Sequence, residues 1–472
     1  MTRMPEFNSR IRDLAAAIGL GRVEEATCPA EPLPFARHGE HCMLVGGENL
    51  SVLSRFLAAA TDSVDLIYID PPYNTGHEFI YSDNRKRSTG GIWREHRDWM
   101  AFMLPRLELS RHLLRESGIV AISIDDHEYA NLKVLMDHIY GGENYIATLI
   151  VCRSKNGRGS KLHVAVNHEY VLLYGKTCQI RLNGLLESES RTYERSDIHG
   201  QYTLDGLFRK KGAASLREDR PNMYFPLYYA AEGSVYTEKV HPDLQVALPH
   251  DSQGIERRWL WGLDKARQES WRLYASPNGV IYVKNYGHPN KRAKLRSLLD
   301  RTEYLTDRAT TEHKKVFGEK VFETPKPLGL IRDLVDACAS KDAVILDFFA
   351  GTGTTAAAAW ELNRADGGER TVVLVEELRP VPATHAAARK GFSTIVDVAA
   401  HRLAAIKSID NNYRFTRYMA ERGTPATCVV GTSPMGAGAK SDPGEPMEPI
   451  EKDRIERIAV SGNSRQQSIF NS

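Results

Sequence analysis

Short apolar stretches alternate with longer amphipathic segments in the first part of the chain. The apolar stretches are rich in aliphatic and β-branched residues, and they are residues 41–47, 63–70, 118–126 and 168–176. The amphipathic segments repeat apolar residues at helical spacing, and they are residues 48–60, 98–116 and 128–140. Strands that alternate with helices are typical of an α/β fold, so we predict a parallel or mixed sheet with helices on both faces.

This alternation stops near residue 181 and returns near residue 316. The intervening stretch has short aromatic runs between basic loops, which predicts an inserted domain of mostly β and irregular structure. Its aromatic run at 224–229 is predicted to belong to the core of that domain. The end of the chain is rich in glycine, proline, serine and charge, which is typical of disorder. The predicted parts are an N-terminal extension at 1–40, a first α/β half at 41–180, the inserted domain at 181–315, a second α/β half at 316–415 and a disordered tail at 416–472.

Composition limits the class of protein. With 472 residues, of which 42% are hydrophobic and 26% charged, the chain has the make-up of a soluble globular protein with a large core. No run approaches the roughly 18 apolar residues of a membrane span, and the N-terminus lacks a signal-peptide pattern. The six cysteines are scattered, with no CxxC pair and no Cys/His cluster at metal-ligand spacing. We therefore expect a cytoplasmic protein with reduced thiols, no membrane contact and no metal.

Charge is distributed unevenly along a chain whose net charge is only +2. Residues 151–300 contain 24 lysines and arginines but 16 aspartates and glutamates, so the middle of the chain is basic. A basic segment suits contact with the phosphates of a nucleic acid, and a solvated loop region can have the same composition. The residues of its basic runs that we predict to contact nucleic acid are Arg209, Lys210, Lys211, Lys291 and Arg292.

The sequence DPPYNTG at residues 70–76 follows a stretch that is typical of a buried strand. Proline lacks an N–H and fixes φ, so Pro71 and Pro72 stop the strand and hold the next residues in one extended shape. The result is a rigid platform that carries Asp70 and Tyr73. An acid at a strand end can also serve only as a helix cap, but the Pro-Pro-Tyr that follows it favours a functional role.

The sequence VILDFFAGTGTT at residues 344–355 combines a buried strand, a glycine-rich turn and the start of a helix. Gly351 and Gly353 allow a tight turn and a close approach to a ligand, and the helix N-terminus offers N–H groups. Glu376 ends the next predicted strand, 23 positions after Gly353, where an acid can bind ribose hydroxyls. No lysine follows the turn, which argues against a phosphate-binding P-loop. S-adenosylmethionine fits better, because it has a ribose, an amine and a carboxylate but no phosphate.

Together and in this order, the two motifs resemble those of β-class amino-DNA methyltransferases, in which the catalytic motif precedes the cofactor motif. The wider resemblance is to the modification (Mod) subunit of type III restriction-modification systems, over about residues 41–410. Beyond the two motifs, it rests on residues 99–114, 123–137, 167–176, 257–266 and 324–335. It implies a Rossmann-like fold with a mixed sheet, a circularly permuted motif order and an inserted target-recognition domain. The chain departs from the family at residues 47–50, which read GENL where members usually have GDNL.

The resemblance implies how the site residues act on a base that is flipped out of the duplex. The Asp70 carboxylate and the Pro71 carbonyl would accept the two N–H groups of the target amine, and Tyr73 would stack on the base. Pro72 completes the catalytic motif, and Asn74 continues it as a DNA-binding residue. The implied cofactor-binding residues are Asp347, Phe349, Gly351, Gly353, Thr354, Glu376, Thr324 and Lys326.

The resemblance implies a site-specific DNA methyltransferase that uses S-adenosylmethionine and acts on adenine N6, in a restriction-modification or phage-defence context. Cytosine-N4 methylation is an alternative, although cytosine-N4 enzymes usually have serine where Asp70 stands. A non-catalytic DNA-specificity subunit is a second alternative, which the intact acceptors and cofactor turn oppose. The implied partners are double-stranded DNA, a second copy of the chain in a homodimer, and a restriction subunit with helicase and nuclease activity. The chain is shorter after the catalytic region than type III subunits usually are, which leaves open an enzyme that works without that subunit.

Overall fold

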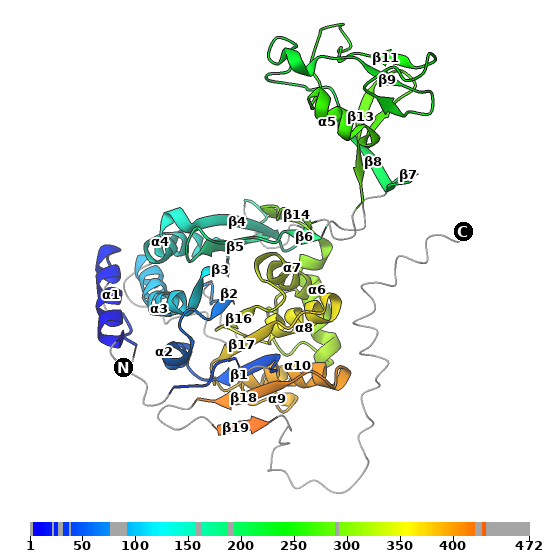
Figure 1. Ribbon diagram of the computed structural model, residues 1–472. Coiled ribbons are helices and arrows are strands. Elements are labelled where there is room, and N and C mark those ends of the chain that lie inside the picture. Colours follow the sequence, from blue (N-terminus) through cyan, green and yellow to red (C-terminus); the bar gives the residue numbers. More distant parts are fainter. Residues whose placement is uncertain are drawn as a thin grey trace, which may run out of the picture. The chain divides into compact units, whose positions relative to one another are not determined.

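The computed structural model describes residues 3–20, 23–26, 32–36, 39–75, 92–156, 163–186, 193–287, 292–420 and 427–430. The chain divides into two compact units, which are Met1–Leu185 with Lys294–Ser472, and Leu186–Ala293. The first unit is therefore built from both ends of the chain, and the second is an insertion between them (Figure 1).

A ten-stranded mixed sheet runs through the described part of the first unit. In spatial order its strands are β15 (Leu298–Leu299), β4 (Tyr145–Cys152), β5 (His168–Gly175), β3 (Leu114–Ile124), β2 (Val64–Ile69), β16 (Val344–Asp347), β17 (Thr371–Glu376), β1 (Cys42–Gly46), β18 (Phe415–Met419) and β19 (Thr427–Val430). From β3 to β18 the neighbouring strands are parallel. β5 is antiparallel to both β3 and β4, and β19 is antiparallel to β18. The predicted α/β fold with a mixed sheet is confirmed.

Helices cover both faces of this sheet (Figure 1). The helices on one side are α1 (Arg3–Ala17), α2 (Asn49–Ala60), α3 (Ile92–Leu113) and α4 (Tyr129–Tyr140), with the short η1 (Gly142–Asn144) after them. The helices on the other side are α6 (Thr306–Phe317), α7 (Leu328–Cys338), α8 (Thr354–Asp366), α9 (Ala386–Arg389) and α10 (Ile395–Ile409), with the short η4 (Thr302–Tyr304) before them. The strands alternate between two hydrophobic cores, since Met43 and Val45 of β1 belong to one and Leu44 belongs to the other.

The central pair of strands, β2 and β16, brings together two segments that lie far apart in the sequence. Leu66 pairs with Ile345 and Ile67 pairs with Leu346, in parallel. Parallel neighbours end at the same edge of a sheet, and ligands of α/β proteins bind in the crevice outside these carboxyl ends. The segments that follow β2 and β16 are therefore placed side by side, where a ligand would bind.

The inserted unit has its own small core. Its described residues form a four-stranded and a three-stranded antiparallel sheet, and a two-stranded sheet of β6 (Leu185–Leu186) and β14 (Arg292–Ala293) lies where the unit begins and ends. The first sheet is made of β12 (Leu273–Ala275), β13 (Ile281–Tyr286), β8 (Gly200–Leu207) and β7 (Arg195–Asp197), and the second of β10 (Val235–Tyr236), β9 (Leu227–Tyr229) and β11 (Gln245–Ala247). Its helices are α5 (Leu263–Gln268), η2 (Pro221–Met223) and η3 (Ser270–Arg272). Phe225 and Tyr229 are buried with Phe208 and Trp259, which confirms for these two residues that the aromatic run belongs to the core.

The two units differ from the predicted boundaries at three points. Residues 181–185, predicted to begin the inserted domain, lie in the first unit. Residues 294–315, predicted to be part of the inserted domain, lie in the first unit because β15 pairs with β4 and α6 packs against α10. The main sheet also extends past the predicted end of the α/β half at residue 415, since β18 pairs with β1 and buries Tyr418 in the core. Disorder was also predicted for residues 427–430, which form β19 and pair with β18. Residues 421–426 and 431–472 of the predicted tail lie outside the described residues.

No described helix is long and apolar enough to cross a membrane. Over the same residues, no group of histidine, cysteine, aspartate and glutamate side chains is arranged to hold a metal ion. Four cysteines are free thiols, and they are Cys42, Cys152, Cys178 and Cys338.

We predict that Leu346→Ala in β16 destabilises the first unit. Leu346 is fully buried in a central strand, and truncation of a buried leucine costs about 2–5 kcal/mol of unfolding free energy. Leu298→Ala is the matched control, because Leu298 is 57% exposed, and its loss should cost about 0.5 kcal/mol or less. Urea denaturation followed by circular dichroism measures both variants. An equal loss in the two would contradict the central place of β16 in the core.

Candidate active site

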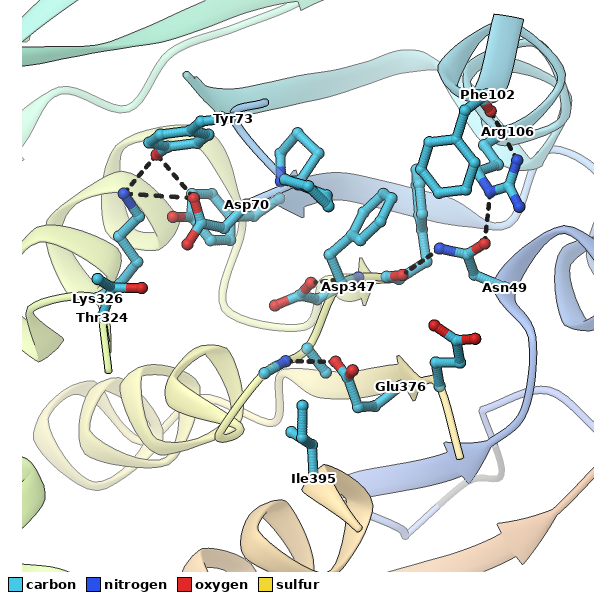
Figure 2. Close-up of a pocket in the computed structure, with 18 of the residues that line it drawn as sticks. Asn49, Asp70, Tyr73, Phe102, Arg106, Thr324, Lys326, Asp347, Glu376 and Ile395 are labelled. Atoms are coloured by element: carbon cyan, nitrogen blue, oxygen red, sulfur yellow. Dashed lines mark hydrogen bonds and ion pairs between the residues drawn. The ribbon is translucent and has the colours of Figure 1, made fainter. Parts of the chain in front are cut away.

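A pocket of about 730 Å³ lies at the carboxyl edge of the sheet in the first unit. Its size is within the range of sites that bind small organic ligands. The segments after β2 and after β16 both line it. In Figure 2, Asp70 and Tyr73 lie close to Lys326, while Asp347 and Glu376 lie on the other side of the same space. The two predicted motifs, which are far apart in the sequence, therefore face one pocket.

The catalytic motif forms a hydrogen-bonded cluster with Lys326 (Figure 2). The Tyr73 hydroxyl donates to Asp70 Oδ1 at 2.8 Å, and the Lys326 ammonium donates to the Tyr73 oxygen at 2.6 Å. Lys326 Nζ also lies 3.3 Å from Asp70 Oδ1. Burial raises the pKa of Asp70, and the positive charge of Lys326 opposes that shift. Lys326, which the family resemblance assigns to the cofactor, thus contacts the proposed catalytic acid directly.

A second carboxylate, Glu169, completes this cluster and was not predicted from the sequence. Each of its oxygens accepts a hydrogen bond from Lys326 Nζ at 2.8 Å. Glu169 lies near the start of β5, and because β5 is antiparallel to β3, its first residues lie at the same edge as the carboxyl ends of β2 and β16. The sequence signal for this residue is an acid at the start of an otherwise apolar strand.

Side chains from neighbouring elements hold the loop after β2. The Trp99 indole donates to the Pro72 carbonyl at 2.7 Å. Asn74 has a left-handed φ of 60°, and its amide donates to Glu128 at 2.7 Å. Glu128 is buried, and it also contacts His96 Nδ1 at 2.8 Å. Asn74 therefore helps to hold the catalytic loop in place, and its contact with DNA stays a prediction.

The segment after β16 turns sharply at two glycines. Gly351 and Gly353 have φ values of 51° and 76°, a region that residues with side chains rarely adopt. Helix α8 begins at Thr354, and within the described structure no side chain caps its N-terminus, so its first N–H groups can serve a ligand. Glu376 Oε2 accepts a hydrogen bond from the Gly351 N–H at 2.7 Å. Four of the predicted cofactor-binding residues thus meet around one turn.

Asp347 supports this turn from within the protein. Its carboxylate accepts a hydrogen bond from the Phe349 N–H at 3.1 Å and another from the Thr355 hydroxyl at 2.6 Å. Burial raises the pKa of Asp347 to about 7. Burial also raises the pKa of Glu376 to about 8, and the charge of Asp347 adds to this rise. The raised pKa values mean that the ionised carboxylates lack stabilising partners. A ligand that brings hydrogen-bond donors or positive charge would stabilise them.

A second hydrogen-bond network, which was not predicted, connects helix α3 to the glycine-rich turn, as Trp99 connects it to the loop after β2. Asn49 donates to the Phe348 carbonyl at 3.1 Å and accepts from Arg106 Nε at 2.5 Å. Arg106 also contacts Glu48 at 2.6 Å, and Glu48 caps the first turn of α2. Arg106 and Trp99 both belong to α3, so this helix holds the catalytic loop and the glycine-rich turn. The sequence signal is the GENL segment, in which glutamate still supplies a capping carboxylate.

The other predicted residues lie in two places. Pro71, Thr324 and Phe349 line the pocket. The predicted DNA-binding residues of the inserted unit are Arg209, Lys210, Lys211 and Arg292, of which Lys211 and Arg292 are exposed. Lys291 lies outside the described residues.

The chain matches the DNA methylase family model (N6_N4_Mtase) over residues 64–376. It is 48% identical to the type II methyltransferase M.KpnI of Klebsiella pneumoniae over 374 residues, which cover 79% of this chain and 89% of that protein. It is 33% identical to the type III EcoPI Mod subunit of Escherichia phage P1 over 77% of this chain, and it spans 62% of that subunit. For the type III StyLTI Mod subunit of Salmonella typhimurium, the identity is 32% and the share of that subunit is 57%.

Solved structures of DNA methyltransferases are more distantly similar. The M1.HpyAVI–SAM complex has 12% identity and a TM-score of 0.34, over 77% of this chain and 100% of that chain. The cytosine-N4-specific PvuII DNA methyltransferase has 12% identity and a TM-score of 0.39, over 77% of this chain and 86% of that chain. Similarity at this level says nothing about the target base.

We predict that, as the pH rises from about 5 to 8, the melting temperature of Glu376→Gln increases relative to that of the wild type. An unfolded glutamate has a pKa of about 4.3, whereas the folded value for Glu376 is about 8. Between these values the folded state holds a proton that the unfolded state has lost, so a rising pH destabilises it. Glutamine stays neutral and can still accept the Gly351 N–H.

Differential scanning fluorimetry between about pH 5 and pH 9 measures this effect. Glu218→Gln, at an exposed position of the inserted unit, is the control and should leave the slope unchanged. Parallel curves for the wild type and Glu376→Gln would contradict the raised pKa.

Proposed function

The chain belongs to the DNA methylase family, and we propose that it transfers a methyl group from S-adenosylmethionine to the N6 amine of adenine in double-stranded DNA. The observation that carries this proposal is the shared pocket, which the Asp70 loop and the glycine-rich turn both line. Reacting groups have to be held about 3–3.5 Å apart in a defined orientation. A single pocket that takes the methyl donor and the target amine makes this possible.

The lining of the pocket suits S-adenosylmethionine. Glu376 offers a carboxylate to the ribose hydroxyls, and the N–H groups at the start of α8 suit the carboxylate of the methionine portion. Apolar side chains are available for the adenine ring, and they are Phe322, Phe348, Phe349 and Ile395. Asp70 and Asp347 add negative charge, which suits a cationic ligand. When bound, S-adenosylmethionine supplies an electrophilic methyl group.

Asp70 and Pro71 would orient the target amine. The lone pair of adenine N6 is delocalised into the ring, so the amine is a weak nucleophile. Hydrogen bonds from its two N–H groups to the Asp70 carboxylate and the Pro71 carbonyl favour a tetrahedral nitrogen whose lone pair points at the methyl group. Asp70 Oδ2 suits this role, because Tyr73 and Lys326 both contact Oδ1. The amine loses one proton after the transfer, and the carboxylate is placed to accept it.

The target nucleotide has to leave the base stack to reach this pocket, at a cost of about a few kcal/mol. The ring of Tyr73 is part of the pocket wall and offers a face for stacking, while its hydroxyl is held by Asp70 and Lys326. Two arguments support adenine over cytosine. Cytosine-N4 enzymes usually have serine at the position of Asp70, and the relatives include Mod subunits, the family whose resemblance to this chain implies adenine N6.

We further propose that the inserted unit reads the DNA sequence and that its basic runs contact phosphates. The higher identity to a type II methyltransferase than to the Mod subunits favours a type II restriction-modification context over a complex with a type III restriction subunit. A homodimer and a cytoplasmic location, which the family resemblance and a DNA substrate support, belong to the same proposal.

We predict that the wild-type protein transfers tritiated methyl groups from S-adenosylmethionine to unmethylated genomic DNA and that nucleoside analysis finds N6-methyladenine. Asp70→Asn should lower the rate about 100-fold or more, because the neutral amide is a weaker acceptor for the amine. Asp342→Asn, at an exposed acid before β16, is the matched control and should keep the wild-type rate. Calorimetry should find that Asp70→Asn still binds S-adenosylmethionine.

Other outcomes of this assay point to the alternatives. If the product is N4-methylcytosine, the target is the N4 amine of cytosine and not the N6 amine of adenine. DNA that is bound but not methylated at either base would favour a non-catalytic specificity subunit.

We also predict that replacing Arg209, Lys210 and Lys211 together by glutamine weakens DNA binding and reduces its salt dependence. Each phosphate contact that is lost lowers the slope of log K against log salt by about 0.9. Fluorescence anisotropy at several salt concentrations measures this slope. Lys239→Gln, at an exposed lysine of the same unit, is the control. An unchanged slope in the triple variant would show that this run is only a solvated loop.

A further inference from the structure

Two carboxylates share one lysine beside the proposed reaction centre. Lys326 Nζ lies 2.8 Å from both oxygens of Glu169 and 3.3 Å from Asp70 Oδ1. The side chains of Lys326 and Glu169 are only 12% and 4% exposed, so solvent screens their charges poorly. With Lys326 protonated and both acids ionised, the cluster carries one net negative charge.

This net charge matters because methyl transfer places positive charge on the target nitrogen. A carboxylate stabilises that charge only to the extent that no neighbouring cation cancels its field. In a pocket that excludes water, such fields act strongly over a few ångströms. A lysine paired with Asp70 alone would give a neutral pair, and much of the benefit of the acid would be lost.

Glu169 is placed to prevent this cancellation. It contacts Lys326 through two oxygens at 2.8 Å, whereas Asp70 makes one contact at 3.3 Å. Arg153 Nε lies 3.6 Å from Glu169 Oε2, but its side chain is 36% exposed and therefore better screened by solvent. Glu169 belongs to β5, a strand between β3 and β4, so a rigid element sets its position.

We propose that Glu169 is a positioning residue that holds Lys326 and offsets its charge, so that the lysine does not cancel the field of the Asp70 carboxylate at the target amine. The inference rests on the proposed methyl transfer and adds a residue to it. Glu169 acts through Lys326, and its Oε2 also accepts a hydrogen bond from the Tyr73 hydroxyl at 3.4 Å. Through Lys326 and Tyr73 it also fixes Asp70 by Oδ1, which leaves Oδ2 directed to the amine.

The test is a double-mutant cycle of E169Q and K326M, in which the rate of methyl transfer to DNA is measured in single turnovers with saturating S-adenosylmethionine. E169Q leaves Lys326 paired with Asp70 alone, and we expect its rate to be about tenfold or more below the wild type. K326M leaves Asp70 without its cation and Glu169 with only the partly exposed Arg153, and it should also be slow. The double variant restores one net negative charge, on Asp70, and should be faster than either single variant.

A purely structural role for Glu169 predicts the opposite order of rates. Two substitutions in one packed cluster would then damage it more than one, and the double variant would be the slowest. A double variant that is no faster than E169Q would therefore overturn the proposal, and so would an E169Q rate equal to that of the wild type. If E169Q does not fold, the rate of K326M is compared with that of the double variant. A faster double variant supports the proposal, and a slower one overturns it.

E108Q is the matched control for this cycle. Glu108 is a fully buried carboxylate that pairs with Arg10 at 2.6 Å and is not among the residues that line the pocket. Its replacement should leave the rate unchanged. Thermal unfolding and S-adenosylmethionine affinity, measured for each variant, separate a change in chemistry from misfolding. A wild type that methylates no DNA refutes the proposed function, whereas an active wild type with an unaffected E169Q refutes only the role of Glu169.

Discussion

The parallel pairing of β2 with β16 is the interaction on which the site depends. Residues 66–67 pair with residues 345–346, and both strands end at the same edge of the sheet. Their loops then face each other across a pocket that neither could form alone. Because both strands are central and buried, the relative position of the two loops is set by the most rigid part of the unit. A reaction between two bound molecules needs this kind of fixed geometry.

The same pocket gathers several buried carboxyl groups, and their burial lowers the stability of the folded state. Burial raises the pKa of Asp70, Asp347 and Glu376, which means that their ionised forms are disfavoured in the folded state. Hydrogen bonds limit this cost at Asp347 and Glu376, where backbone N–H groups of the turn donate to the carboxylates. At Asp70 the compensation comes from Lys326. Helix α3 stabilises both loops from outside the pocket, through Trp99 and Arg106.

Much of the fold could be predicted because burial leaves a local pattern. The strand before Asp70 and the strand before the glycine-rich turn are both apolar runs, and the helices between strands repeat at helical spacing. Prediction was weaker where a strand is very short. β15 has two residues, and it is recognisable only through its pairing with β4. For the same reason the boundary of the inserted unit was placed too late, since nothing within residues 294–315 indicates which sheet they join.

By itself, the sequence determined the α/β class and the two motifs, because each motif is contiguous. Pro71 and Pro72 set Asp70 relative to Tyr73, and the glycines shape the turn before α8. Only the tertiary structure decided which side chains meet. Glu169 reaches Lys326 because β5 runs antiparallel to β3, and Arg106 reaches Asn49 because α3 packs against α2. The residues of a strand encode its burial, but the direction of that strand depends on partners that are distant in the sequence.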